Sequence, residues 1–340
     1  MHKLIAIVGP TASGKTKLAV DLARKFGGEI VSADSRQVYR GMDIGTGKEL
    51  RAYGKGHRSI RYHLIDVVTP KTNFTLAQYQ KRAYRAIEDI LRRGKLPILV
   101  GGTGLYVQAV VDGYVLPEAP PNHKLRSRLT KFTLAQLRAK LKKLDLATYR
   151  VIDKNNRRRL ERAIEICLTT GAPLSKQRVK KAPSYKILIL GLAPSKKTLH
   201  QRIDKRLYER LKQGMVEEVA RLHAQGISWK RLESFGLEYR YVAGNLQDVT
   251  KLSIANSVDR PSLRYKSGQK IPRHIWQLAS NQEQYDKLVS ELSSGIKDFA
   301  RRQMTWFKRD KRIVWVKNKK EAERLVRKFL EKFDMPAIVG

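Results

Sequence analysis

Apolar residues in this chain form short continuous runs that are separated by longer stretches with helical spacing. Continuous runs, without alternating polar positions, are typical of strands buried on both faces of a parallel sheet. Runs of this kind occupy residues 4–8, 29–32, 96–100, 185–192 and 313–316. The pattern therefore predicts an α/β fold, a doubly wound parallel sheet covered by helices, with ligands at the carboxyl ends of the strands.

The strand pattern stops between Pro117 and Pro183, where the spacing becomes helical. We therefore expect residues 1–119 to form the first part of a core that contains a phosphate-binding loop (P-loop). Residues 120–182 would form an inserted all-helical domain, and residues 183–340 would complete the core.

Two helical patterns define apolar faces. In the insertion, the residues on one face are Leu160, Ile164, Cys167 and Leu168. In the second part of the core, they are Leu199, Ile203, Leu207 and Leu211, with Ser195 as a candidate N-cap. We expect both faces to be buried, including Cys167, the single cysteine, which excludes an internal disulfide. Residues 248–284 lack clear periodicity, and we expect a surface insertion or a partly ordered excursion there.

The first apolar run leads directly into a complete phosphate-binding motif, and a helical pattern follows it. The residues of the motif are Gly9, Pro10, Thr11, Ala12, Ser13, Gly14, Lys15 and Thr16. Glycines at both ends let backbone N–H groups surround an anion, the lysine reaches its outer oxygens, and the Thr16 hydroxyl can ligate Mg²⁺. The chain is therefore expected to bind a phosphorylated small molecule.

Two further strands are followed by residues that could take part in catalysis. Asp34 follows the second run, and the glycine-rich turn 101–104, which contains Thr103, follows the run 96–100. The run 96–100 does not end in the acidic residue that holds the metal in most ATP-hydrolysing machines. Asp34 stands where a proton acceptor would meet an incoming nucleophile, although an Asp can equally serve as a turn former or N-cap there.

The chain carries 70 Lys and Arg residues against 31 Asp and Glu, a formal net charge of +39. This excess indicates a polyanionic partner, most simply nucleic acid, unless the source organism favours basic proteins in general. The insertion is the densest part, with 18 basic and 4 acidic residues between 120 and 182. We expect a cytoplasmic protein, because the N-terminal apolar run is only five residues long and no membrane-spanning run follows.

Two basic segments allow more than one interpretation. Residues 157–162 contain four arginines beyond the apolar face, which favours contact with a phosphate backbone over a merely solvated surface. Residues 301–309 interleave basic and aromatic side chains, which can bind RNA or pack a terminal helix against the sheet.

The sequence as a whole resembles a known family, the bacterial tRNA dimethylallyltransferases, also called tRNA isopentenyltransferases. The resemblance rests on Gly9–Thr16, Asp34–Thr46, Tyr62–Asp66, Gly101–Tyr106, Asn155 with Arg159–Glu165, and Arg302–Phe307. The first motif is common among phosphate-binding proteins, whereas the second and fourth in this order are specific to the family. Arg158 stands where a glutamine is common, and residues 248–284 have no recognised counterpart.

The resemblance implies transfer of a dimethylallyl group from dimethylallyl pyrophosphate to the N6 amine of adenosine 37 in tRNA, beside the anticodon. The loop would then hold the pyrophosphate of the donor, with Lys15 and Mg²⁺ at Thr16 neutralising the leaving group. Asp34 would accept the proton of the amine, and Thr103 would orient the base. The implied tRNA contacts are Asp34, Ser35, Arg36, Gln37, Thr103, Arg126, Arg158, Arg159, Leu160, Glu161 and Arg162.

Other classes of protein share parts of this pattern. A P-loop small-molecule kinase would use ATP but should show arginine-bearing lid motifs and would not need the basic insertion. An isopentenyltransferase acting on free adenine nucleotides would share the chemistry and leave the insertion without a role. A non-enzymatic RNA-binding protein would have no need for Lys15, Asp34 and Thr103 together. We therefore expect an enzyme that works as a monomer on the tRNA anticodon stem-loop.

Overall fold

The computed structural model describes residues 2–54, 56, 59–115, 119–177, 183, 185–255 and 282–332. Contacts divide the chain into two compact units. The first combines Met1–Val107 with Ser184–Gly340 and contains the sheet, and the second is Gln108–Pro183.

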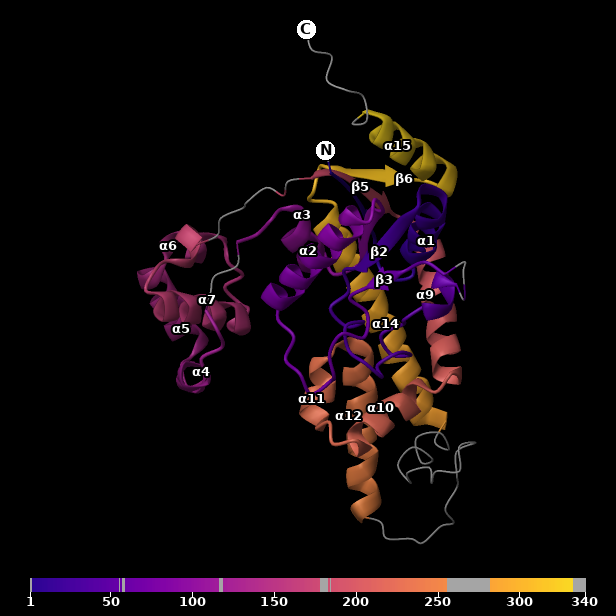
Figure 1. The fold of residues 1–340 in the computed structure, drawn as a ribbon. Coiled ribbons are helices and arrows are strands. Elements are labelled where there is room, and N and C mark those ends of the chain that lie inside the picture. The colour runs from indigo at the N-terminus through magenta and orange to yellow at the C-terminus, as the bar shows by residue number, and fades with distance from the viewer. Residues whose placement is uncertain are drawn as a thin grey trace. The chain divides into compact units, whose positions relative to one another are not determined.

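A six-stranded sheet forms the centre of the first unit (Figure 1). Its strands, in the order in which they pair, are β3 (Tyr62–His63), β2 (Gly28–Ser32), β4 (Leu96–Gly101), β1 (Lys3–Val8), β5 (Lys186–Leu192) and β6 (Ile313–Val316). Every neighbouring pair is parallel. The predicted parallel α/β sheet and its five strands are confirmed. Strand β3 was not predicted, because its two residues are too few to form an apolar run.

Helices cover the sheet because their apolar faces meet its buried strands. They include α1 (Lys15–Phe26), α2 (Leu76–Arg92), α3 (Gly104–Val111) and α15 (Lys319–Lys332), and a short 3-10 helix spans Leu50–Tyr53. In one core, Leu18 and Leu22 of α1 pack with Ile5 and Ile7 of β1, all of them nearly or fully buried. Helix α2 begins at a capping box in which Thr75 and Gln78 satisfy each other's backbone N–H groups.

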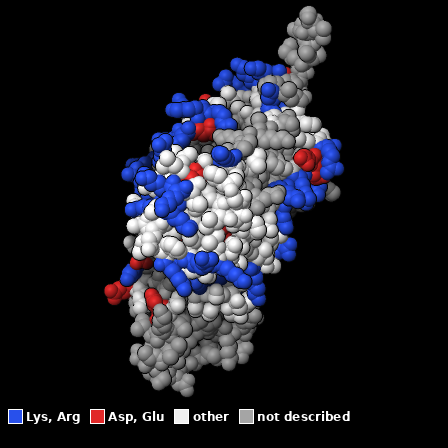
Figure 2. All heavy atoms as spheres, turned by 90° about the vertical axis from the view of Figure 1, so that its left-hand side faces the viewer, with Lys and Arg blue, Asp and Glu red and all other residues white. Residues whose placement is uncertain are grey.

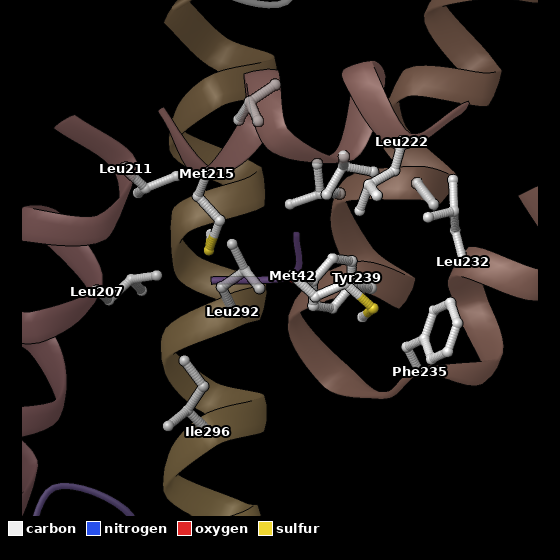
Figure 3. Packing of buried hydrophobic residues seen from close by; sticks show 14 of the residues in the cluster. Met42, Leu207, Leu211, Met215, Leu222, Leu232, Phe235, Tyr239, Leu292 and Ile296 are labelled. Atoms are coloured by element: carbon white, nitrogen blue, oxygen red, sulfur yellow. The ribbon is translucent and has the colours of Figure 1, made fainter. Parts of the chain in front are cut away.

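A second core of the first unit lies where several helices pack around the long helix α14 (Figures 1 and 3). These helices are α9 (Lys196–Lys212), α10 (Met215–Ala224), α11 (Trp229–Ser234), α12 (Leu237–Ala255) and α14 (Gln282–Phe307). The predicted face of α9 is buried, and Ser195 Oγ accepts a hydrogen bond from Thr198 N at 3.2 Å, as its expected cap role requires. Within the described ranges, no helix has the length and apolar character needed to cross a membrane.

The predicted excursion at 248–284 is wrong at both ends. Residues 248–255 continue helix α12, and residues 282–284 begin α14. The absence of clear periodicity was therefore a poor sign of irregular structure at these positions. The rest of the interval lies outside the described residues.

The second unit is built from short helices around its own apolar core. They are α4 (His123–Leu129), α5 (Leu134–Leu144), α6 (Leu146–Val151), α7 (Arg157–Thr170) and α8 (Leu174–Gln177). Side chains cap the starts of four of them, namely Asn122, Thr133, Asp145 and Asn156. Leu160, Ile164 and Cys167 of α7 are buried as expected. Leu168 is 42% exposed, contrary to expectation, because it lies about 70° around the helix from the centre of that face.

A buried carboxylate fastens α7 to the segment before it. Glu165 Oε1 accepts hydrogen bonds from Asn122 N at 2.7 Å and Arg126 Nε at 2.8 Å, and Oε2 accepts one from Arg162 at 2.6 Å. Burial favours the neutral acid, but the hydrogen bonds from the two arginines and Asn122 outweigh it and lower the pKa of Glu165 to about 2.

This arrangement predicts an acid-sensitive second unit. Above pH 4.5 the Glu165 carboxylate is charged whether the unit is folded or not, so its full stabilisation is present. That stabilisation is lost as the pH falls from about 4.5 towards 2. The protection factors of the α7 amides, which are hydrogen-exchange rates corrected for the pH dependence of intrinsic exchange, should therefore fall between pH 5 and pH 3 in the wild type.

The Glu165→Gln variant should exchange faster already at pH 5 and change less with pH. Glu161→Gln is the matched control, because Glu161 pairs with Arg157 at the surface of the same helix. Equal pH dependence in the wild type and in Glu165→Gln would contradict this account.

Candidate active site

The phosphate-binding motif forms the loop between β1 and α1. Gly9 follows β1 in a place without space for a side chain, since a Cβ there would lie 2.8 Å from Leu192 O. Gly14 precedes α1 with φ at +91°, a conformation that L side chains rarely adopt. The first N–H groups of α1 have no acceptor within the helix, and they open onto this loop. The backbone is therefore shaped to bind an anion.

Two side chains of the loop could also bind an anion. Lys15 Nζ donates to Pro10 O at 3.1 Å, and burial lowers the pKa of Lys15 to about 8, although Asp34 raises it. Ser13 Oγ is buried and has no hydrogen-bond partner in the described part of the chain. A buried ammonium and an unpaired hydroxyl are costly unless a bound anion compensates them.

Helix α9 brings arginines to the same loop. Arg202 Nη1 lies 3.4 Å from Ser13 O, and Arg206 Nη2 donates to Gly47 O at 2.9 Å. Arg210, one turn further along, pairs with Glu238 at 3.3 Å. Burial, together with the neighbouring Arg210, lowers the pKa of Arg206 to about 10, so it stays charged near neutral pH. The loop therefore lies beside a concentration of positive charge.

These α9 arginines were not predicted from the sequence as site residues. Each stands one residue before a member of the apolar stripe Ile203, Leu207 and Leu211, and their spacing of four places them on one face of α9. That regular spacing beside a buried stripe was the available signal.

The turns after β2 and β4 meet at the same edge of the sheet. Asp34 Oδ1 accepts from Arg36 N at 2.9 Å, which makes Asp34 a turn former. Ser35 N donates to Thr103 Oγ1 at 3.1 Å, and Thr103 N donates to Ala33 O at 3.3 Å. The structure thus brings Asp34 and Thr103 together through Ser35.

The remaining residues of the Asp34 turn are partly buried. Gln37 Nε2 lies 3.4 Å from Gly47 O, the carbonyl that Arg206 also contacts. Arg36 extends over Gly236, where a Cβ would overlap its guanidinium at 1.1 Å. Gly236 has φ at +114°, so both the turn conformation and the arginine require a glycine there.

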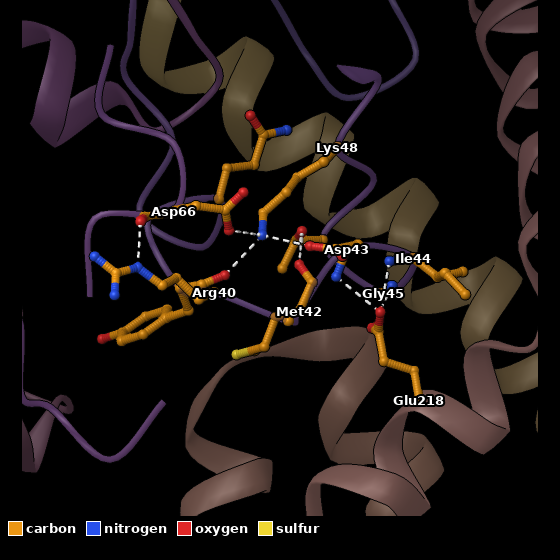
Figure 4. A network of polar contacts seen from close by, with 12 residues as sticks. Arg40, Met42, Asp43, Ile44, Gly45, Lys48, Asp66 and Glu218 are labelled. Atoms are coloured by element: carbon orange, nitrogen blue, oxygen red, sulfur yellow. Dashed lines mark hydrogen bonds and ion pairs between the residues drawn. The ribbon is translucent and has the colours of Figure 1, made fainter. Parts of the chain in front are cut away.

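Two buried charges hold the loop that follows this turn (Figure 4). Lys48 Nζ donates to Tyr39 O and Asp43 Oδ1, each at 2.7 Å, and it pairs with Asp66. On the other side, Glu218 Oε2 accepts from Asp43 N at 2.7 Å and from Ile44 N at 2.8 Å. A carboxylate that binds consecutive backbone N–H groups fixes a loop firmly, so the residues after Asp34 are rigid.

The tRNA contacts expected in the second unit fall into two groups. Arg158 and Arg159 are exposed at the start of α7. Arg126 and Arg162 instead bind Glu165, and Glu161 binds Arg157. Leu160 is fully buried, so its side chain offers no surface to RNA. Figure 2 shows one face of the molecule, on which basic side chains far outnumber acidic ones.

The fold and the loop define a P-loop α/β protein with an anion site beside a carboxylate. A family model described as IPP transferase matches residues 37–310. A tRNA dimethylallyltransferase 1 from Syntrophus aciditrophicus is 42% identical over 323 residues, which are 93% of this chain and 94% of that protein. One from Geotalea daltonii is 42% identical and covers 92% and 88% of the two chains.

Solved structures agree with this match. The full-length tRNA isopentenylpyrophosphate transferase from Bacillus halodurans is 30% identical, with a TM-score of 0.62 over 98% of this chain and 96% of that one. A eukaryotic dimethylallyltransferase crystallised acting on tRNA shares the fold, with a TM-score of 0.73 at 21% identity. The chain therefore belongs to the tRNA dimethylallyltransferase family.

Proposed function

We propose that this enzyme transfers a dimethylallyl group from dimethylallyl pyrophosphate to the N6 amine of adenosine 37 in tRNA, giving N6-dimethylallyladenosine. The observation that carries the proposal is the site itself, in which Lys15 of the phosphate-binding loop and arginines of α9 lie beside a turn containing Asp34 and Thr103. Family membership and the names of the relatives support the choice of prenyl donor and tRNA acceptor.

The loop would bind the pyrophosphate of the donor. The pyrophosphate oxygens would accept hydrogen bonds from the N–H groups at the start of α1, from the Lys15 ammonium and from the nearby α9 arginines. In the reaction the bond between C1 of the dimethylallyl group and the pyrophosphate oxygen breaks, and its electrons leave with the pyrophosphate. Fixed positive charge in a buried site stabilises this developing charge.

A divalent metal fits the same loop. Mg²⁺ usually takes one or two protein oxygens and completes its octahedral shell with substrate phosphates and water. The described residues contain no group of three or more His, Cys, Asp or Glu side chains able to hold a metal. The Thr16 hydroxyl, at the start of α1, is the residue that would ligate Mg²⁺, which would supply further charge neutralisation for the leaving group.

Asp34 and Thr103 would serve the acceptor. The adenine amine is a weak nucleophile, and as its nitrogen bonds to C1 of the donor it must lose a proton, which Asp34 would accept. Asp34 Oδ1 is oriented by the N–H groups of Arg36 and Gln37, so the carboxylate is held in place. Thr103, hydrogen-bonded to Ser35, would orient the base beside it.

The acceptor base must leave the anticodon-loop stack to reach such a site. The basic residues of the second unit would hold the tRNA meanwhile, with exposed Arg158 and Arg159 on phosphates. Ser35, Arg36 and Gln37 would contact the nucleotides around the extruded base. Arg126 and Arg162 would contribute while bound to Glu165. Loops from a single chain supply donor and acceptor groups alike, which supports a monomer, and the tRNA substrate supports a cytoplasmic location.

One incubation separates this function from its alternatives. Purified protein, Mg²⁺ and labelled dimethylallyl pyrophosphate are mixed with unmodified tRNA or with AMP, and the nucleosides are analysed by mass spectrometry. The proposal requires label on adenosine 37 and none on AMP. Label on AMP alone would assign the enzyme to free nucleotides, and label on neither would reopen the kinase and RNA-binding alternatives.

Substitution of Asp34 tests the proton acceptor. Asp34→Asn keeps an oxygen for the N–H groups of Arg36 and Gln37 but removes the basic carboxylate. Single-turnover transfer at saturating substrates should fall by roughly 10² to 10⁴. The dissociation constant for tRNA, measured in parallel, should change by less than about threefold. A rate close to that of the wild type would remove Asp34 from this role.

Substitution of the exposed arginines tests the tRNA surface. Replacing Arg158 and Arg159 together by glutamine should reduce the slope of log affinity against log salt by roughly 1.5, if each meets a phosphate. Arg92→Gln with Lys319→Gln is the matched control, since those side chains are 76% and 54% exposed in the first unit. The same loss of slope in both double variants would mean that only total charge matters.

A further inference from the structure

One side chain from the far end of the sequence joins two loops of the active site. Gln303, near the end of α14, is only 8% exposed. Its Oε1 accepts a hydrogen bond from Thr11 N at 2.8 Å, and its Nε2 donates one to Gly102 O at 2.8 Å. A single amide thus connects the phosphate-binding loop to the glycine turn.

The glycine turn packs closely against α14 on both sides of Thr103. A Cβ on Gly102 would lie 2.5 Å from Gln303 Nε2 and 3.5 Å from Lys15 Cε. On the other side of Thr103, a Cβ on Gly104 would lie 2.3 Å from an indole carbon of Trp306. Two residues one turn apart on α14 therefore touch the turn directly before and directly after Thr103. This assigns a packing role to the motif at 302–307.

The chemistry of the contact is specific to a primary amide. Thr11 N presents a donor and Gly102 O presents an acceptor, and the Gln303 side chain carries one group of each complementary kind. Methionine fills a similar volume and offers neither hydrogen bond. The Thr11 N–H is committed to Gln303, so the anion must be bound by later groups of the loop.

We propose that Gln303 is a positioning residue that sets the separation between the loop holding the donor pyrophosphate and the turn whose Thr103 orients the acceptor base. The inference rests on the proposed function. Transfer needs the attacking nitrogen and C1 of the donor in near contact, and a displacement of about 1 Å can cost on the order of 100-fold in rate. Gln303 acts through Thr11 and Gly102 and touches neither reacting atom.

The test is single-turnover transfer to tRNA by Gln303→Met at saturating donor and tRNA. The rate should fall at least tenfold, while the dissociation constant for tRNA stays within twofold. Leu288→Ala is the matched control, because Leu288 is fully buried on the same helix, about four turns before Gln303. It should lower the melting temperature yet keep the wild-type rate when both variants are assayed well below unfolding.

A second variant reaches the same contact from the other side. Gly102→Ala places a methyl group where the amide of Gln303 lies, so it should break the link even with Gln303 present. Because both substitutions remove one interaction, the double variant should be no slower than the slower single variant. The comparison of the double variant with the two single variants stays informative even if either single variant folds less well.

The outcomes are distinct. Full activity of Gln303→Met beside an active wild type would overturn the inference alone, as would multiplicative losses in the double variant. Equal rate losses in Gln303→Met and Leu288→Ala would reduce Gln303 to a stabilising residue and overturn it too. A wild type that transfers no prenyl group to tRNA would contradict the proposed function first, and this inference with it.

Discussion

The parallel register of β2, β4 and β1 determines where every reactive group of this enzyme lies. Val8 stands opposite Gly101, and Ser32 stands opposite Val100, so the three strands end at one level of the sheet. The phosphate-binding loop, the Asp34 turn and the Thr103 turn therefore begin side by side. Gly101 makes this possible, since a Cβ there would lie 2.1 Å from Ala33 O. Any side chain at this position would force the two turns apart.

Charge then gives this common edge its chemistry. Lys15 and Arg206 are both partly buried beside the loop, and burial lowers the pKa of each, although Arg206 also pairs with Glu49 at 2.7 Å. The strand that ends in an acidic metal ligand in most ATP-hydrolysing machines ends here in glycines and Thr103. These features suit a loop that holds a pyrophosphate as a leaving group and need not break its phosphoryl bonds. The Asp34 turn would offer a carboxylate to the acceptor, and Lys48 and Glu218 fasten the loop that follows this turn.

Local patterns in the sequence were sufficient to predict five of the six strands, the phosphate-binding loop and the helical start at Ser195. Each of these depends on residues close together in the chain, such as an apolar run or a cap. The contact of Gln303 with Thr11 joins residues 292 apart, so no local pattern could reveal it. The spacing of Arg206 on α9 places it beside a buried stripe, but only the packed fold shows that it reaches Gly47 and the phosphate-binding site.

The central claim is that the loop binds pyrophosphate through buried cations, and calorimetric titration with inorganic pyrophosphate in the presence of Mg²⁺ tests it most directly. The account predicts that the wild type binds pyrophosphate more tightly than ATP. It also predicts that Lys15→Met and Arg206→Met each weaken pyrophosphate binding at least tenfold, whereas Arg92→Gln, exposed elsewhere in the same unit, has no effect. Preference for ATP, or pyrophosphate binding that survives both substitutions, would contradict it.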